Sequence, residues 1–180
     1  MASTSLFSAI DVLSHHGIIA HQTDTVIGFA CLPSEKLLIR LQRLKLRPDS
    51  KGFIVLASSL NQVTHLINAN QDELKLITSP TEKPTTWLVN ASNLAPNSLL
   101  GNTRKIAIRL TQHPDVTTIC QHVGAIASTS ANLSQQQICH DLNQVRAMFG
   151  PGIDYIQKES TPGTGQSSTI IDSSSGTILR

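Results

Sequence analysis

Hydrophobic side chains recur at helical spacing in several separate stretches of the chain. Leu6, Ile10 and Leu13 lie three or four residues apart, so they share one face of a predicted helix. Gly17 follows that helix, where a glycine commonly marks a helix C-terminus. Ser34 precedes a second apolar stretch and is a typical N-cap residue. Further helices are predicted around the apolar positions of 37–44, 60–66, 116–123 and 142–149.

Short continuous apolar runs lie between these helices. The run 52–57, GFIVLA, is too short for a good helix and is typical of a strand covered on both faces. Because helices and buried strands alternate, the pattern predicts an α/β fold of sheet and helices in which strand directions can be mixed. Strands are expected at 18–20, 52–57, 85–89, 106–110 and 125–129, with shorter strand-like pieces at 154–157, 168–172 and 177–179.

The length of the chain fits a single domain. With 180 residues, of which 39% are hydrophobic, it can bury a core without disulfides or metal. The segment 158–167, KESTPGTGQS, is short, polar and rich in Gly and Ser. We interpret it as a loop over a site rather than a domain boundary, so residues 1–180 are expected to form one domain.

Charge and composition exclude several classes of protein. The net charge is only +2, and aromatic residues make up 3% of the chain, which disfavours a protein that lives on duplex nucleic acid. Three cysteines without a CxxC pair indicate a reduced cytoplasm. The first residues lack the pattern of a signal peptide, and no apolar run approaches the roughly 20 residues that span a bilayer. We therefore expect a cytoplasmic protein without a membrane partner.

Three cations stand close together where the second predicted helix meets the strand at 52–57. Lys45, Arg47 and Lys51 fall within seven residues, with Pro48 and Gly52 to shape the turn. Cations in such a cluster can offset the charge of a nucleotide triphosphate, and Arg can bind phosphate oxygens in a two-pronged fashion. The alternative is a solvated helix C-terminus, where Lys and Arg are favourable in any case.

A run of short hydrogen-bonding side chains, STSANLS at 128–134, directly follows the predicted strand at 125–129. Ligands of α/β proteins bind beyond the carboxyl ends of strands, and Ser130 and Asn132 can bind phosphate or ribose oxygens there. The alternative is that these residues only cap a helix.

Lys105 and Arg109 lie four residues apart on a predicted strand and so share one face of it. That face is directed either to a cleft or, as the alternative, to a sheet edge that charge protects from pairing.

Several familiar catalytic patterns are absent from the sequence. There is no Walker A loop and no GxGxxG, which disfavours a standard P-loop or Rossmann nucleotide site. The seven histidines show no HExxH or Cys/His spacing, so no metal-ligand set is predicted. No GxSxG supports a serine nucleophile.

In their order along the chain, these motifs resemble the YrdC-like domain family, which includes threonylcarbamoyl-AMP synthases. The resemblance spans nearly the whole chain and implies a twisted open mixed α/β sheet with a positively charged concave face. The residues that carry it are Thr23-Asp24-Thr25 with Gly28, Lys45-Leu46-Arg47, Ile106 to Arg109 followed by His113-Pro114, and Ser130-Ala131-Asn132.

The resemblance also implies a site and a reaction, in which L-threonine, bicarbonate and ATP give threonylcarbamoyl-AMP and pyrophosphate. Magnesium is expected with the triphosphate, held mainly by phosphate oxygens and water. By similarity, Lys45 and Arg47 would be catalytic. ATP would be bound by Lys45, Arg47, Lys51, Lys105, Ser130, Asn132 and Arg180, and threonine by Thr23, Thr25, Arg109 and Ser168.

The implied product serves a downstream complex, the tRNA threonylcarbamoyl-transferase, which modifies adenosine in tRNA. Two alternatives stay open at this point. The chain could be a non-enzymatic module that binds RNA or tRNA on its positive face. It could also be a related carbamoyl-adenylate enzyme with another acceptor, because His21-Gln22 stands where the family usually has Tyr-Pro.

Overall fold

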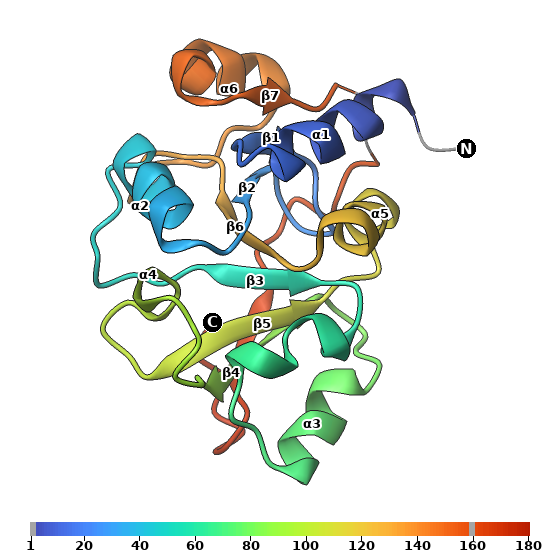
Figure 1. Cartoon of the computed structure of the whole chain (residues 1–180), viewed down its shortest axis with the longest axis vertical. Helices are drawn as coiled ribbons and strands as arrows, with labels where there is room; N and C mark the ends of the chain where they lie inside the picture. The colour runs from blue at the N-terminus through green and yellow to red at the C-terminus, as the bar shows by residue number, and fades with distance from the viewer. Residues whose placement is uncertain (1–2, 159–160) are drawn as a thin grey trace.

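One eight-stranded sheet runs through the protein (Figure 1). The computed structural model describes residues 3–158 and 161–180. The strands follow the order β7-β1-β2-β6-β3-β5-β4-β8, with both parallel and antiparallel pairs, so the expected mixed α/β fold is confirmed. Their bounds are β1 Ile19–His21, β2 Gly28–Cys31, β3 Ile54–Ala57, β4 Thr85–Asn90, β5 Lys105–Leu110, β6 Ile126–Ser130, β7 Tyr155–Ile156 and β8 Thr169–Asp172.

Helices flank this sheet on both sides. None of those in the described part of the chain is long and apolar enough to cross a membrane. The helices predicted near the N-terminus and at 37–44, 116–123 and 142–149 are confirmed. The α-helices are α1 Thr4–Ser14, α2 Glu35–Leu44, α3 Gln71–Thr78, α4 Asn97–Leu100, α5 Pro114–Val123 and α6 Leu142–Phe149, and the 3-10 helices are η1 Leu60–Gln62, η2 Thr64–Leu66 and η3 Gly150–Gly152.

Two apolar clusters hold the layers together. The smaller cluster packs α1 and α5 against β1, β2, β3 and β6, through residues such as Leu13, Ile119 and Ile126. The larger cluster joins α2, α4 and α6 to the opposite side of the same strands and continues over β4 and β5. On β6, Ile126 packs under the helices while Ser128 and Ser130, which follow at a period of two, share its face. That face is therefore apolar under the helices and polar beyond them.

The expectation of a helix at 60–66 was wrong. Two 3-10 turns occupy this segment and meet at the fully buried Val63. The side chain of Gln62 holds the chain here, since its Oε1 accepts from Ser58 N at 2.9 Å and its Nε2 donates to Cys120 O at 2.6 Å. Pattern reading also missed β2, α3 and α4, while the expected strand at 177–179 makes only an isolated bridge from Ile178 to Ile171.

The end of α1 differs from the prediction as well. The left-handed residue is His16, with φ 61°, and the glycine comes one position later. Gly17 N donates to Val12 O at 2.8 Å. A Cβ on Gly17 would lie 2.4 Å from Val12 Cγ1, so the glycine is needed for this close approach rather than for a left-handed turn.

Candidate active site

The loop between β1 and β2 folds back on itself through its threonines. Thr23 Oγ1 lies 2.9 Å from Thr25 Oγ1, accepts from Thr25 N at 3.1 Å and donates to Val26 O at 2.8 Å. Both threonines are buried. A hydroxyl that hydrogen-bonds its own backbone two or three residues on is a common way to fix a tight turn. The loop therefore presents Thr25 in a fixed position.

Arg109 meets this loop from β5. Its Nη1 donates to Thr25 Oγ1 at 3.4 Å, and its Nη2 forms an ion pair with Asp24 Oδ1 at 3.1 Å. The side chain is 4% exposed, and its Nε has no hydrogen-bond partner among the described residues. Burial lowers the pKa of Arg109, which Asp24 opposes, but a guanidinium stays charged in proteins. The Arg109 guanidinium is therefore buried and permanently charged, and its Nε–H has a hydrogen bond left to donate. Such a group is suited to binding the carboxylate of a ligand.

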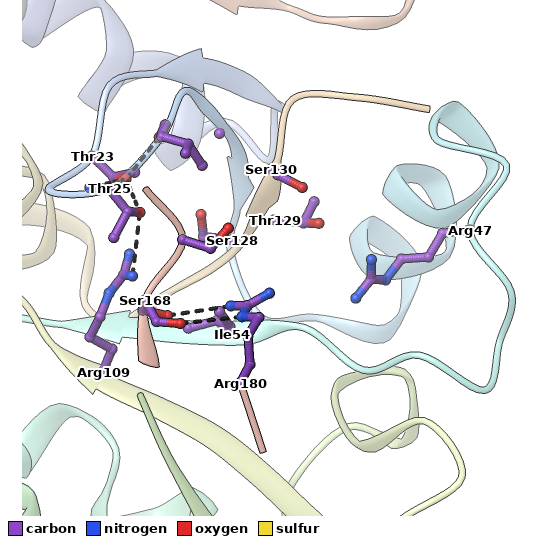
Figure 2. Close-up of a pocket in the computed structure, with 13 residues that line it drawn as sticks. Thr23, Thr25, Arg47, Ile54, Arg109, Ser128, Thr129, Ser130, Ser168 and Arg180 are labelled. Carbon is purple, nitrogen blue, oxygen red and sulfur yellow. Dashed lines mark hydrogen bonds between the residues drawn. The ribbon is translucent and has the colours of Figure 1, made fainter. Parts of the chain in front are cut away.

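A cavity of about 120 Å³ opens beside Arg109, with no Asp or Glu among the described residues that line it. Figure 2 shows Arg109 and Arg47 on opposite sides, with Arg180 and Ser128 between them. Three arginines, Arg47, Arg109 and Arg180, line it, and of these Arg109 is paired with Asp24. This lining suits an anionic ligand. The lining comprises Thr23, Thr25, Val26, Gly28, Arg47, Ile54, Arg109, Ser128, Thr129, Ser130, Ser167, Ser168 and Arg180.

The end of the segment 161–168, Ser167 and Ser168, forms one wall of the cavity. Thr164 N donates to Asp24 O at 3.2 Å and Gly165 N donates to Thr25 O at 2.7 Å. These two hydrogen bonds hold the segment against the loop between β1 and β2. A Cβ on Gly163 would lie 2.2 Å from Thr23 O, so only glycine allows this approach. Residues 159 and 160 of the predicted loop lie outside the described residues.

Ser168 is held in place by its neighbours at the end of this wall. Its Oγ lies 2.9 Å from Thr86 Oγ1 in a buried contact, and Arg180 Nε donates to Ser168 O at 3.2 Å. Burial lowers the pKa of Arg180. Arg180 thereby brings the end of the chain to the cavity, although it is 12 residues away from Ser168 in sequence.

Arg47 stands at the other end of the cavity. Its Nε donates to Lys51 O at 3.1 Å, and its Nη2 donates to Gly52 O. The guanidinium lies 5.1 Å from the centre of the Phe53 ring, which orients it further. Burial lowers the pKa of Arg47. The turn after α2 thus holds a charged, oriented guanidinium at the cavity mouth.

Lys45 lies behind the Ser/Asn segment and does not line the cavity. Its Nζ donates to Ser130 O, to Asn132 O at 2.6 Å and to Asn132 Oδ1 at 3.1 Å. Three acceptors match the three N–H groups of an ammonium. Burial, and then the charge of Arg47, lower the pKa of Lys45 to about 7. Lys45 therefore anchors the backbone that carries Ser130 and Asn132.

Most of the residues predicted from the sequence come together at the cavity. All four threonine candidates line it, and so do three of the ATP candidates, Arg47, Ser130 and Arg180. Asn132 lies just behind, with its Oδ1 accepting from Ser130 Oγ at 2.7 Å. Lys51 is exposed and Lys105 is turned away to Asp172, so neither lines the cavity.

Sequence reasoning missed the roles of Asp24 and Thr86. The sequence analysis gave Asp24 no role of its own between the two threonines, yet Asp24 is the ion-pair partner of Arg109. Thr86 supports Ser168 from β4. Strand alternation could have indicated Ser128, which shares a sheet face with Ser130, but no local pattern joins Asp24 to a residue 85 positions later. No group of three His, Cys, Asp or Glu that could hold a metal ion occurs in the described ranges.

The ion pair of Lys105 gives a testable pH dependence. Lys105 Nζ lies 2.5 Å from Asp172 Oδ2, and this hydrogen bond, followed by that from Ser174, lowers the pKa of Asp172 to about 2. Because the folded pKa lies below the unfolded one, the carboxylate stabilises the fold above about pH 4, and this is lost as the pH falls towards about 2. In Lys105→Met, the urea midpoint should fall less between about pH 6 and pH 3 than in wild type. Lys75→Met, which removes an exposed ion pair with Asp72, is the control. An unchanged acid dependence in Lys105→Met would contradict this assignment.

Gly28 marks the floor of the cavity and allows a second test. A Cβ at this position would lie 3.0 Å from Thr129 O and 3.2 Å from Ser128 Oγ, so these atoms, which belong to two residues that line the cavity, would have to shift by a few tenths of an ångström. We expect Gly28→Ala to lower ligand-dependent turnover by about 10- to 100-fold, because small misplacements in a site are costly. The matched control is Gly150→Ala, whose Cβ would have its nearest neighbour at 3.8 Å. Equal turnover in both variants would show that the floor is not in contact with ligand.

A family model relates this geometry to known proteins. The Sua5/YciO/YrdC family, described as telomere recombination, matches residues 11–180. The chain belongs to this family. A threonylcarbamoyl-AMP synthase of Haemophilus influenzae is 38% identical over 145 residues, which cover 78% of this chain and 79% of that protein. One of Shigella dysenteriae serotype 1 is 36% identical over 181 residues, which cover 98% and 95%. The resemblance seen in the motifs is thereby confirmed.

Solved structures of this family have the same fold. P. abyssi Sua5 complexed with L-threonine superposes with a TM-score of 0.88 at 23% identity, over 97% of this chain and 53% of that chain. This chain therefore spans about half the length of that Sua5. E. coli YciO superposes with a TM-score of 0.76 at 19% identity, over 93% of this chain and 82% of that chain.

Proposed function

We propose that this protein is a threonylcarbamoyl-AMP synthase, which makes threonylcarbamoyl-AMP and pyrophosphate from L-threonine, bicarbonate and ATP. The observation that carries the proposal is one cavity with a buried arginine and two threonine hydroxyls at one end, and with Arg47 and Ser130 at the other. Two synthases by name, 36% and 38% identical to this chain over most of its length, support the same reaction.

Threonine would occupy the end at Arg109. The guanidinium would bind its carboxylate, with Asp24 holding the guanidinium in place from behind. Thr23, Thr25 and Ser168 supply hydroxyls that can both donate and accept, and they suit the threonine hydroxyl and amine. A site that hydrogen-bonds a substrate hydroxyl rejects analogues without it strongly, which favours threonine over valine.

The phosphates of ATP would occupy the end at Arg47. Arg47 and Arg180 would offset the phosphate charges, and Ser130 would donate to a phosphate oxygen. Lys45 would act by fixing the backbone of Ser130 and Asn132, with its own charge close behind. Lys51 and Lys105 would contribute from outside the cavity, Lys105 only after its ion pair with Asp172 opens.

The reaction then follows from the two ends of the cavity. The threonine nitrogen bonds to the carbon of bicarbonate and water leaves, which gives a carbamate. A carbamate oxygen bonds to the α-phosphorus of ATP, and the bond from that phosphorus to the pyrophosphate oxygen breaks. This chemistry needs positioning and neutralisation of charge more than a protein nucleophile. The arginines at both ends of the cavity supply those two requirements.

Magnesium enters this proposal as part of the substrate. No carboxylate among the described residues lines the cavity, so its walls fit an ion that is bound mainly by phosphate oxygens and water. We further propose that residues 1–180 act as one domain in the cytoplasm, where the three free, buried cysteines stay reduced. The product would pass to a tRNA threonylcarbamoyl-transferase complex.

The test is pyrophosphate release from ATP and bicarbonate by the purified protein, with L-threonine, L-valine, L-serine or no amino acid. We expect release with threonine that exceeds release with valine by far, since valine lacks the hydroxyl. Thr25→Val should remove most of this discrimination, whereas Thr78→Val on the exposed surface of α3 should not.

Three other outcomes would contradict the proposed reaction. Release that depends on a different amino acid would point to a related carbamoyl-adenylate enzyme. RNA binding with a steep salt dependence, and without ATP turnover, would point to the RNA-binding module. If the protein neither binds ATP nor releases pyrophosphate, the proposal that it is an enzyme is wrong.

A further inference from the structure

A surface away from the cavity combines cations with exposed apolar side chains. Lys36, Ile39 and Arg43 recur every three or four residues along α2, which places them on one side of the helix. Leu46 follows two residues after the helix ends. α2 lies at the edge of the molecule, on the side opposite α5 (Figure 1). We call the set His16, Lys36, Ile39, Arg43 and Leu46 the α2 surface.

The α2 surface borders a groove between the end of α1 and the outer side of α2. The groove has a volume of about 1020 Å³, is lined mainly by apolar surface, and includes His16, Lys36, Ile39 and Arg43. A second hollow of about 550 Å³ shares Ile39 and Arg43 and extends past Leu46 to Arg47. The surface therefore leads from the groove to a residue of the cavity described above.

The groove carries uncompensated positive charge. Arg40, which also lines it, is neutralised by Asp154 through contacts of 2.7 and 2.9 Å. Lys36 and Arg43 have no ion-pair partner among residues 3–158 and 161–180. No carboxylate from these ranges lines the groove, whereas Glu35 and Asp49 line the second hollow. A matching ligand must bring both acidic groups and apolar ones.

The backbone at both helix ends holds side chains out toward this surface. His16 follows α1 with φ 61°, and Leu46 follows α2 with φ 49° and is 73% exposed. Glycine is the usual residue at such a left-handed position, because other residues are strained there. Glycine would therefore favour the fold more than histidine or leucine does. Strain of this kind is a reason to look for a function of the side chain.

We propose that the α2 surface is a docking site for an acidic, amphipathic segment of another protein. An apolar groove with a basic rim is the complement of a helix that has leucine-like anchors on one face and Asp or Glu beside them. RNA fits less well, because the described residues lining the groove include no Phe, Tyr or Trp on which bases could stack. The groove itself includes none of the residues assigned above to threonine or ATP.

Defined probes can test the proposal on the intact protein. The main probe is a fluorescent helical peptide of about 18 residues, or five turns, with leucines at i, i+4 and i+7 and glutamates beside them. Matched probes replace each glutamate with lysine, scramble the same composition, or substitute an oligouridylate. Fluorescence anisotropy gives the affinities at two salt concentrations. Pyrophosphate release measures whether each variant keeps an intact active site.

We expect saturable binding of the acidic amphipathic peptide, weakened by salt, and much weaker binding of the three matched probes. The double variant Lys36→Glu/Arg43→Glu should weaken it by at least about tenfold, whereas Lys75→Glu on α3 should not. His16→Gly should weaken binding of the acidic peptide, while the melting temperature of the protein stays the same or rises, because glycine is favoured at a left-handed position. Weaker binding without a loss of stability would indicate that the His16 side chain serves binding rather than the fold. Pyrophosphate release should be unchanged in all of these variants.

Three results would overturn the proposal. The first is binding of the acidic peptide that is no tighter than binding of the scrambled one. The second is equal affinity in Lys36→Glu/Arg43→Glu and Lys75→Glu. The third is preferential binding of oligouridylate that the α2 variants abolish, which would reassign the surface to RNA.

Discussion

Arg109→Met should lower kcat/KM for threonine by about 10²- to 10³-fold, as expected when one partner of a buried charge pair is removed. The substitution takes away the proposed ligand of the threonine carboxylate. Among the described residues, it leaves the Asp24 carboxylate with one long contact, from Thr111 Oγ1 at 3.4 Å. The unpaired carboxylate would repel the carboxylate of threonine. Most of the loss should therefore appear in KM for threonine, while KM for ATP changes little.

Steady-state pyrophosphate release, with threonine and ATP varied separately, measures this effect. Arg104→Met is the matched control, because Arg104 is exposed one residue before β5. A second variant, Asp24→Asn, keeps the guanidinium but removes its ion-pair partner, and it should raise KM for threonine less than Arg109→Met does. Equal kinetics in Arg109→Met and Arg104→Met would remove Arg109 from the threonine site.

Lys45→Met should destabilise the protein by about 1 to 3 kcal/mol, because a buried acceptor left without a donor costs about that much. The ammonium donates to Ser130 O and to both oxygens of Asn132, and methionine can donate to none of them. Ser130 O keeps the Asn132 N–H as a donor and Asn132 Oδ1 keeps the Ser130 hydroxyl, so Asn132 O is the acceptor that loses its donor. The lysine is 1% exposed, so water cannot readily replace it. Ser130 and Asn132 should lose their fixed positions, and turnover should fall even where the variant remains folded.

Urea unfolding gives the stability change, and pyrophosphate release below the melting temperature gives the change in turnover. Lys75→Met is the control, since the Lys75 side chain is 74% exposed and pairs only with Asp72 on the same helix. A Lys45→Met variant that unfolds at the wild-type urea concentration but has lost turnover would show that Lys45 contacts ATP directly. A variant with wild-type stability and wild-type turnover would contradict both roles.

Helices and strands could be predicted where one periodicity dominates. The apolar spacing of 37–44 and 142–149 located α2 and α6, because tertiary contacts there reinforce the local pattern. At 60–66 the apolar spacing was equally helical, yet the side-chain contacts of Gln62 with Ser58 and with Cys120, 58 residues away, hold two 3-10 turns. Local periodicity contains no information about such a partner.

By itself, the sequence determined the fold class and the kinds of side chain at the site, because hydrophobic period and motif order are local properties. Only the tertiary structure decided which cations face the cavity. Arg47, Arg109 and Arg180 come from three distant segments and converge there, whereas Lys105 turns to Asp172 and Lys45 to the backbone behind Ser130. The physical reason is that a cation points to the acceptors that folding brings near it, and for Lys105 and Lys45 those acceptors lie 67 to 87 residues away along the chain.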